Sequence, residues 1–278
     1  MGNMCSLLLA IAFALAANVA SGCDKKGVGL AEFREPSKIA RLNVSWYYTW
    51  HLAPIPGVKG PEFVPMQWSK PDGETEHLLV NSRFPVLLSF NEPDRTAQAG
   101  LSVAEASGIW PRLESASMRL GSPATSRPGA RWMRQFMEMA EERKARVDFV
   151  ALHLYSGTDP NEFLRTVDWA YREFRRPIWI TEFAVADWKA QGPGSNRYSE
   201  HEVLTFMQKV VPELEARDFV ERYAWFGAGR SAGMKEVIRT SRLFEADGEL
   251  SRLGRYYAQL TGKCSDAAPS APSREPSS

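Results

Sequence analysis

The sequence predicts an α/β fold, a single (β/α)8 TIM barrel, and three observations lead to this prediction. Short apolar runs rich in β-branched and aromatic residues recur along the chain. Amphipathic stretches of helical length separate most of these runs, which is typical of parallel βα units. Segment 23–264 also has the length of one such barrel, roughly 250 residues. The two ends of the chain differ from this segment in composition.

Eight apolar runs are expected to form the strands, and the stretches between them the helices. The expected strands are residues 27–30, 43–50, 62–68, 85–91, 118–123, 147–155, 178–182 and 220–226. The expected helices are residues 102–117, 130–143, 161–174, 200–217 and 250–260. The first helix begins with Ser102 and Glu105 in the spacing of a capping box. Residues 51–61 carry three prolines and two glycines, so we expect an irregular or missing helix between the second and third strands.

The two ends of the chain are expected to lie outside the barrel. Residues 1–22 contain an uninterrupted apolar run from Leu7 to Ala17, followed by small residues, which is typical of an export signal. This run is too short to span a bilayer comfortably. Residues 265–278 form a Pro/Ser/Ala-rich tail that cannot bury enough apolar surface to fold. We therefore expect a secreted, periplasmic or cell-envelope protein with no transmembrane span in the mature chain.

Two cysteines flank the expected barrel, and the sequence leaves two roles open for the first. Cys23 directly follows the small residues of the export signal, as the lipidated cysteine of a bacterial lipoprotein does. The two ends of a barrel chain close against each other, so Cys23 could instead form a disulfide with Cys264 in an oxidising compartment. The usual leucine three residues before a lipidated cysteine is missing, which favours the disulfide.

Composition narrows the class of ligand. The chain has 34 basic and 33 acidic side chains and a formal charge of +1, so it lacks the charge excess typical of nucleic-acid-binding or membrane-surface proteins. Nine tryptophans are more than core packing usually requires, and flat aromatic rings suit the stacking of sugar rings. The chain carries no Gly-rich phosphate loop and no zinc-type cysteine spacing, so we expect no cofactor and no metal. A chain that can bury one sizeable core by itself is expected to be a monomer.

Glutamates close two of the expected strands. Glu92 directly follows the fourth strand, and Glu182 ends the seventh. In a parallel barrel both carboxylates would emerge at the C-terminal rim, where enzymes with this fold keep their active sites. Hydrolysis of a glycosidic bond requires one carboxyl group to protonate the leaving oxygen and a second to attack or stabilise the anomeric carbon. The structural alternative for either residue is a helix cap or an ion pair with a nearby arginine.

Polar residues near the end of the sixth strand are also expected at this rim. His153 and Tyr155 are two residues apart, so both side chains point to one side, which we expect to be the barrel interior. There they would orient Glu182 or a sugar hydroxyl. For His153 the alternative is a histidine whose hydrogen bonds are satisfied within the core.

Aromatic residues at other strand ends are candidates for sugar contacts. Tyr48 and Trp50 share one face of the second strand by the same alternation. Trp68 ends the third strand, and Trp225 lies near the end of the eighth. We expect Trp225 to form a platform on which a sugar ring stacks.

Five short motifs, taken in their order and strand placement, resemble those of glycoside hydrolase family 128, a family of clan A barrels. They are Phe63–Met66, Phe90–Asp94, Leu120–Ala124, Trp179–Ala184 and Arg222–Gly227. The resemblance covers nearly all of residues 24–262. It implies a retaining hydrolase of β-1,3-glucan, with endo action expected.

The resemblance also implies residue roles. Glu92 would be the general acid/base and Glu182 the nucleophile, with Asn91 bound to a sugar hydroxyl beside the reacting carbon. Retention predicts carboxyl groups roughly 5 to 5.5 Å apart. Other β-glycans (mannan, xylan or β-1,4-glucan) and a non-catalytic glycan-binding barrel remain as alternatives. A metal site built from Glu92, His153 and Glu182 is disfavoured, because it leaves Asn91 and the aromatic rim without a role.

Overall fold

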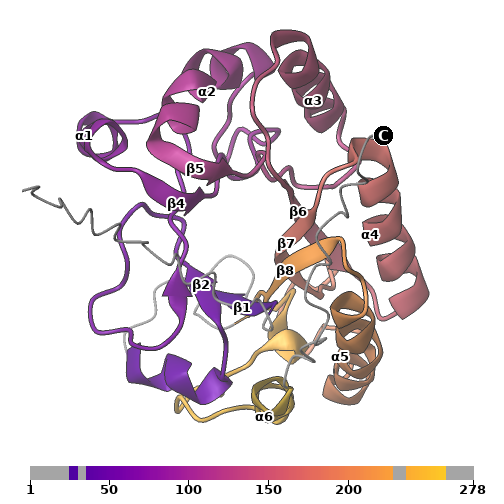
Figure 1. Cartoon of the computed structure of the whole chain (residues 1–278). Helices are drawn as coiled ribbons and strands as arrows, with labels where there is room; N and C mark the ends of the chain where they lie inside the picture. Colours follow the sequence, from indigo (N-terminus) through magenta and orange to yellow (C-terminus); the bar gives the residue numbers. More distant parts are fainter. Residues whose placement is uncertain (1–24, 31–35, 228–235, 261–278) are drawn as a thin grey trace, which may run out of the picture.

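The strands of the computed structural model lie in a ring with the helices on its outside, as Figure 1 shows. The structure describes residues 25–30, 36–227 and 236–260. All strand pairs are parallel. Six strands form one sheet in the order β3 (Glu62–Phe63), β2 (Trp46–Tyr48), β1 (Lys26–Gly29), β8 (Val220–Trp225), β7 (Ile178–Val185) and β6 (Val150–Ser156). The remaining strands, β4 (Phe84–Leu87) and β5 (Ser117–Leu120), form a pair of their own.

The two sheets are connected by isolated bridges rather than by continuous ladders. Met66 pairs with Leu88 on one side, and Gly121 pairs with Phe149 on the other, both in parallel. The order of strands is therefore that of the predicted barrel, while the hydrogen-bonded ladders stop between β3 and β4 and between β5 and β6.

Six α-helices cover the strands in the described part of the chain. They are α1 (Gly73–Asn81), α2 (Val103–Ala116), α3 (Arg131–Arg143), α4 (Pro160–Phe174), α5 (Glu200–Glu215) and α6 (Arg252–Gln259), with 3-10 helices at Pro36–Leu42 and Arg239–Ser241. The five predicted helices are confirmed, and so is the capping box of Ser102 and Glu105. Residues 51–61 form no helix, as their prolines and glycines predict.

The sequence did not predict α1 or the 3-10 helix Pro36–Leu42. Only Leu79 is buried in α1, so this helix has no apolar stripe to mark it. Its start is instead fixed by a capping box between Asp72 and Thr75.

Several predictions concern residues outside the described part of the chain. These are the export signal 1–22, the tail 265–278 and both roles of Cys23, including the disulfide with Cys264. Among the helices that are described, none has the length and apolar character needed to cross a membrane.

Two apolar clusters separate the inside of the ring from the layer under the helices. The inner cluster contains residues from strands and their extensions alone: Trp46, Tyr48, Val64, Met66, Leu88, Phe149, Trp179 and Ala224. The outer cluster joins the opposite faces of the strands, such as Ile178 and Ile180, to the helices. Strands such as β7 and β8 therefore present alternate residues to the two clusters, and the inner cluster fills the ring below the polar rim.

Glycines in β1 make room for the large rings of the inner cluster. A Cβ atom on Gly27 would lie 2.2 Å from Cε2 of Trp46, whose ring is fully buried. A Cβ on Gly29 would lie 3.0 Å from the ring of Trp50 and 3.1 Å from that of Tyr48. The missing side chains on β1 therefore let the aromatic side chains of β2 cross the ring toward β7.

Gly27→Ala is expected to lower the free energy of unfolding by about 1–3 kcal/mol, because the new methyl group overpacks a site that the buried Trp46 cannot leave. Urea denaturation measures this change. Gly108→Ala in α2 is the control, since its Cβ meets nothing within 4 Å, and a gain of up to about 1 kcal/mol is expected from helix propensity. Equal stability of Gly27→Ala and the wild type would contradict the inner packing described above.

Candidate active site

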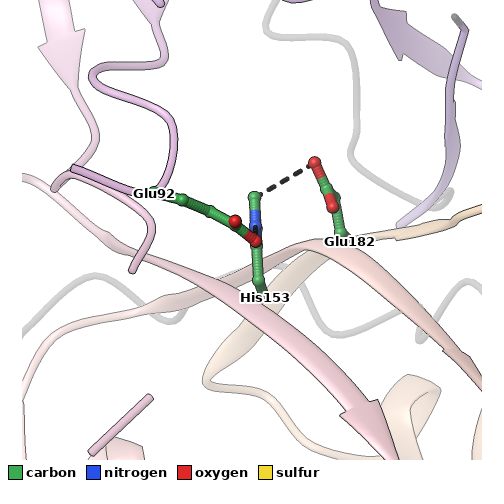
Figure 2. Close-up of side chains that lie close together, drawn as sticks. All are labelled: Glu92, His153 and Glu182. Carbon is green, nitrogen blue, oxygen red and sulfur yellow. Dashed lines mark hydrogen bonds and ion pairs between the residues drawn. The ribbon is translucent and has the colours of Figure 1, made fainter. Parts of the chain in front are cut away.

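Three titratable side chains meet at the C-terminal ends of β4, β6 and β7. Nδ1 of His153 lies 3.1 Å from Oε1 of Glu92, and its Nε2 lies 3.3 Å from Oε1 of Glu182. Figure 2 shows the histidine ring between the two carboxylates. One oxygen of each glutamate and one nitrogen of His153 all lie within 4.8 Å of one another. The two glutamates, 90 positions apart in the chain, therefore face one site.

A bulge in β7 places Glu182 on the inner side of the ring. Ile178 and Ile180 pack outward under the helices, so strict alternation would send Glu182 outward as well. The register with β6 passes from Leu152↔Ile180 to His153↔Glu182, which leaves Thr181 as an extra residue in β7. This extra residue returns Glu182 to the interior. Glu182 also does not end the strand, as the sequence predicted, because β7 continues to Val185.

The backbone at Glu92 is left-handed, with φ of 42°. Few residues other than glycine adopt this conformation, and such strain is often stored at functional sites. Two backbone hydrogen bonds hold it: Glu92 N donates to Ala124 O, and Glu92 O accepts from Arg95 N. The Asp94 side chain fixes the same loop by accepting from the backbone and hydroxyl of Ser126. The acid is thus held at the rim by the connection after β4.

Three aromatic side chains donate hydrogen bonds to Glu182. Tyr155 Oη donates to Oε2 at 2.5 Å, Trp50 Nε1 to Oε1 at 3.0 Å, and Tyr48 Oη to Oε1 at 3.3 Å. Burial, followed by the negative charge of Glu182, raises the pKa of both tyrosines well above the usual value. Both phenols therefore keep their protons, and donors of this kind stabilise the ionised form of a carboxylate. The predicted shared face of Tyr48 and Trp50 is confirmed, with ring centroids 4.7 Å apart.

The pKa values of Glu92 and His153 shift in opposite directions. Burial lowers the pKa of His153, but the charge of Glu182 and the hydrogen bond with Glu92 raise it above its usual value. Burial raises the pKa of Glu92, but the hydrogen bond and charge of His153, with a smaller effect of Arg95, bring it below the usual value. Nε2 of His153 is close to Glu182, yet it makes no hydrogen bond of acceptable geometry. The three groups form a coupled cluster in which His153 lies between two carboxylates.

This cluster predicts a pH window of stability. The pKa of His153 is higher in the folded protein than its ordinary value of 6.5, so protonated His153 stabilises the fold. This contribution is complete below pH 6.5 and is lost as the pH rises through the raised pKa. The lowered pKa of Glu92 stabilises the fold fully above pH 4.5 and is lost as pH falls through the lowered pKa. The melting temperature of the wild type should exceed that of His153→Gln most between these two values. A difference independent of pH would contradict the charged state of His153.

Asn91, Trp50, Tyr48, His153 and Tyr155 are all brought to the glutamates, as the sequence predicted. Oδ1 of the Asn91 side chain accepts from Nε1 of Trp50 at 3.1 Å, and its Nδ2 donates to Oε1 of Gln98 at 3.2 Å. The Trp50 indole thus connects Asn91 to Glu182. Trp68 lies beside this group: its backbone carbonyl accepts from Asn91 N, and its side chain is 36% exposed.

The prediction that Trp225 forms a sugar platform is wrong for this structure. Trp225 is fully buried in the outer cluster, where its ring packs on Phe183 and its indole N–H donates to Ser241 O at 2.8 Å. Ala224 faces the interior, so the alternation in β8 has the opposite phase to the one assumed. Phe226 takes the rim position instead, with its ring 5.9 Å from that of Trp50 and 5.5 Å from that of Tyr155.

Sequence reasoning also missed Arg95 and Gln98. Both lie in the loop after β4, where no periodicity indicates which side chains face the site. Arg95 Nε is 3.8 Å from Oε2 of Glu92. One feature of the sequence indicated that these two side chains lie near the site, which is that both follow Glu92 within six residues.

The ligand chemistry of the cluster fits an acid pair better than a metal centre. Glu92, His153 and Glu182 offer three donor atoms within 4.8 Å of one another. Glu92 and His153 already hydrogen-bond each other, and both oxygens of Glu182 accept from aromatic donors. A cation would have to displace these bonds before it could bind.

Comparison with known proteins assigns the family. The family described as glycosyl hydrolase catalytic core matches residues 28–257. The chain belongs to this family. The match begins within β1, ends within α6 and includes both glutamates.

Known relatives of this glycosyl hydrolase include one curated protein. Alkali-sensitive linkage protein 1 of Schizosaccharomyces pombe is 30% identical over 221 residues, which are 77% of this chain and 40% of that protein. The chain therefore spans well under half the length of this relative.

Two solved structures confirm the resemblance to family 128. An endo-β-1,3-glucanase of family 128 (subgroup I) from Amycolatopsis mediterranei, in complex with laminaritriose, is 33% identical with a TM-score of 0.72. The match covers 84% of this chain and 99% of that one. An exo-β-1,3-glucanase of subgroup V from Cryptococcus neoformans is 27% identical with a TM-score of 0.67, and the match covers 84% and 98% of the two chains. The predicted α/β barrel class is confirmed with the family.

Proposed function

We propose that this glycosyl hydrolase cleaves internal bonds of β-1,3-glucan with retention of configuration at the anomeric carbon. The reaction passes through a glycosyl ester on Glu182. The proposal rests on the short distance between the two carboxylates. One oxygen of Glu92 lies within 4.8 Å of one oxygen of Glu182. Retaining enzymes hold their carboxyl groups about 5 to 5.5 Å apart, whereas inverting enzymes leave roughly 6.5 to 9.5 Å for a water molecule. The spacing supports direct attack by one carboxylate.

Glu182 is the nucleophile in this proposal because its surroundings hold the carboxylate in place. It is 5% exposed, and it accepts hydrogen bonds from Tyr155, Trp50 and Tyr48. These neutral donors hold the carboxylate in one orientation without neutralising it. A fixed orientation favours attack on the anomeric carbon of a bound sugar.

Glu92 is the general acid/base, and His153 shares its proton. The cluster holds one proton on Nδ1 of His153 or on Oε1 of Glu92, atoms that lie 3.1 Å apart. A sugar bound over the site removes water from Glu92, which raises its pKa and favours the protonated acid. Glu92 then gives this proton to the leaving oxygen while Glu182 forms the ester. In the second half, Glu92 takes a proton from water, the water oxygen attacks the anomeric carbon, and the ester bond to Glu182 breaks.

The remaining site residues either bind the sugar or orient the two acids in this proposal. Asn91 contacts a hydroxyl beside the reacting carbon, while Trp50, Tyr48, Tyr155 and His153 orient the two acids. Trp68, with 36% of its surface exposed beside Asn91, offers a stacking face. No cofactor enters any step.

Cleavage of a panel of polysaccharides by the purified protein tests this function. Laminarin and curdlan should be hydrolysed, while β-1,4-glucan, mannan and xylan should not. Early products should be a range of oligosaccharides, because the subgroup I structure with the higher identity is named an endo-acting enzyme. NMR of the first product should show the β anomer. Release of glucose alone would indicate exo action, and an α anomer would overturn the retaining mechanism.

We also propose that the protein is exported and acts as a monomer. The apolar run Leu7–Ala17 supports export, with the barrel 23–264 as the functional unit and the tail 265–278 outside it. Cell fractionation tests export, and light scattering of the purified protein tests the oligomeric state.

A further inference from the structure

Trp188 is the most exposed tryptophan in the described part of the chain. Its side chain is 58% exposed, whereas Trp46, Trp110, Trp179 and Trp225 are fully buried. Trp188 lies three residues after the end of β7, on the connection to α5. Single exposed apolar residues are common, but aromatic side chains beside an active site are the usual lining of a ligand site, so the place of this indole decides its role.

The connection that carries Trp188 is fixed at both ends. The carboxylate of Asp187 is completely buried and accepts from Nε and NH2 of Arg197, from Arg197 N and from Lys189 N. The hydrogen bonds to Arg197 hold the pKa of Asp187 well below its usual value. Asp187 N also donates to Val237 O, and the Asn196 amide donates to Glu236 O and Val237 O. Trp188 directly follows this anchored aspartate, so its position is set before a ligand binds.

Trp188 is also connected to Glu182 through the side chain of Tyr155. Its ring lies edge-on to the ring of Tyr155, with centroids 5.7 Å apart. Tyr155 Oη in turn donates to Oε2 of Glu182. The exposed indole is therefore separated from Glu182 by one aromatic side chain, that of Tyr155.

We propose that Trp188 is a stacking platform for the glucosyl unit next to the one that reacts at Glu182. Flat indole faces suit the apolar faces of sugar rings, and the anchored loop lowers the entropy lost on binding. This assignment rests on the proposed function, since it takes β-1,3-glucan as the ligand. Asp187 and Arg197 act as positioning residues for the indole.

Calorimetric titration of laminarihexaose into inactive protein tests the platform. Glu182→Gln serves as the binding background, because it does not consume the ligand. Adding Trp188→Ala should weaken the dissociation constant about tenfold, whereas Trp188→Phe should restore most of the affinity because it keeps an aromatic face. In the active enzyme, Trp188→Ala should raise KM for laminarin about tenfold with a smaller change in kcat.

Tyr171→Ala is the matched control. Tyr171 is 39% exposed on α4, and it stacks on Phe219 at the start of β8, at the opposite end of the ring. This substitution should leave both the dissociation constant and KM unchanged. Unchanged binding in Trp188→Ala, with laminarin still hydrolysed by the wild type, would overturn the platform and leave the proposed function intact. Failure of the wild type to hydrolyse laminarin would overturn both.

Discussion

Glu182→Gln is expected to lower kcat on laminarin by on the order of 10⁵-fold, the largest effect of any single substitution in this chain. The amide has nearly the same shape, and its one carbonyl oxygen can still accept from Tyr155, but it cannot form the glycosyl ester. The fold should be retained with a lower melting temperature, because the NH2 group cannot accept the hydrogen bonds that Trp50 and Tyr48 donate to the other oxygen of Glu182. Initial rates at saturating laminarin and thermal unfolding measure the two quantities.

The matched control is Glu138→Gln, which removes a carboxylate from the exposed face of α3 and should leave kcat unchanged. A mechanism-based trap gives an independent test. A 2-deoxy-2-fluoro glucoside should leave a covalent sugar on the wild type, and mass spectrometry should map it to the peptide that contains Glu182. A labelled peptide from another strand, or full activity of Glu182→Gln, would show that the nucleophile is assigned incorrectly.

Glu92→Ala is expected to lower kcat on laminarin by roughly 10²- to 10⁴-fold, because the leaving oxygen then departs without a proton. The loss should be much smaller for aryl glucosides whose leaving group is stable as an anion. With such substrates the ester on Glu182 should accumulate, since no base remains to activate water. Steady-state kinetics on both substrate types separate the acid role from a purely structural one.

Azide provides a further criterion for Glu92. In Glu92→Ala this small anion should enter the vacated space, attack the ester without base assistance and yield a β-glucosyl azide. Restored turnover by azide in Glu92→Ala, but not in Glu182→Gln, would identify the two roles separately. If natural and activated substrates lost equal activity and azide had no effect, the acid/base would have to be another residue.

The order of strands and the position of the two glutamates could be predicted because they depend on local signals. Strand and helix alternate with clear apolar patterns, and Glu92 and Glu182 interrupt those patterns where a core would not tolerate a charge. His153 and Tyr155 were correctly placed on the interior because β6 alternates regularly through both residues.

The errors arose where side-chain direction depends on tertiary contacts. The phase of β8 is set by Ala224, whose small side chain fits beside the rings of the inner cluster, so Trp225 turns outward. Both residues are apolar, and the sequence offers no local reason to choose between the two phases. The bulge at Thr181 is likewise invisible in the sequence, because it is defined by the register with neighbouring strands. Trp188 lies in a connection, where the exposure of a side chain depends on how the loop is anchored.

The extra residue in β7 makes the reaction depend on strand register as well as on residue identity. If Thr181 were paired regularly with β6, the sequence would be unchanged and yet the Glu182 carboxylate would face the apolar layer beneath the helices. Deletion of Thr181 would instead leave Glu182 directly after Ile180, so regular alternation alone would keep the carboxylate inside the ring.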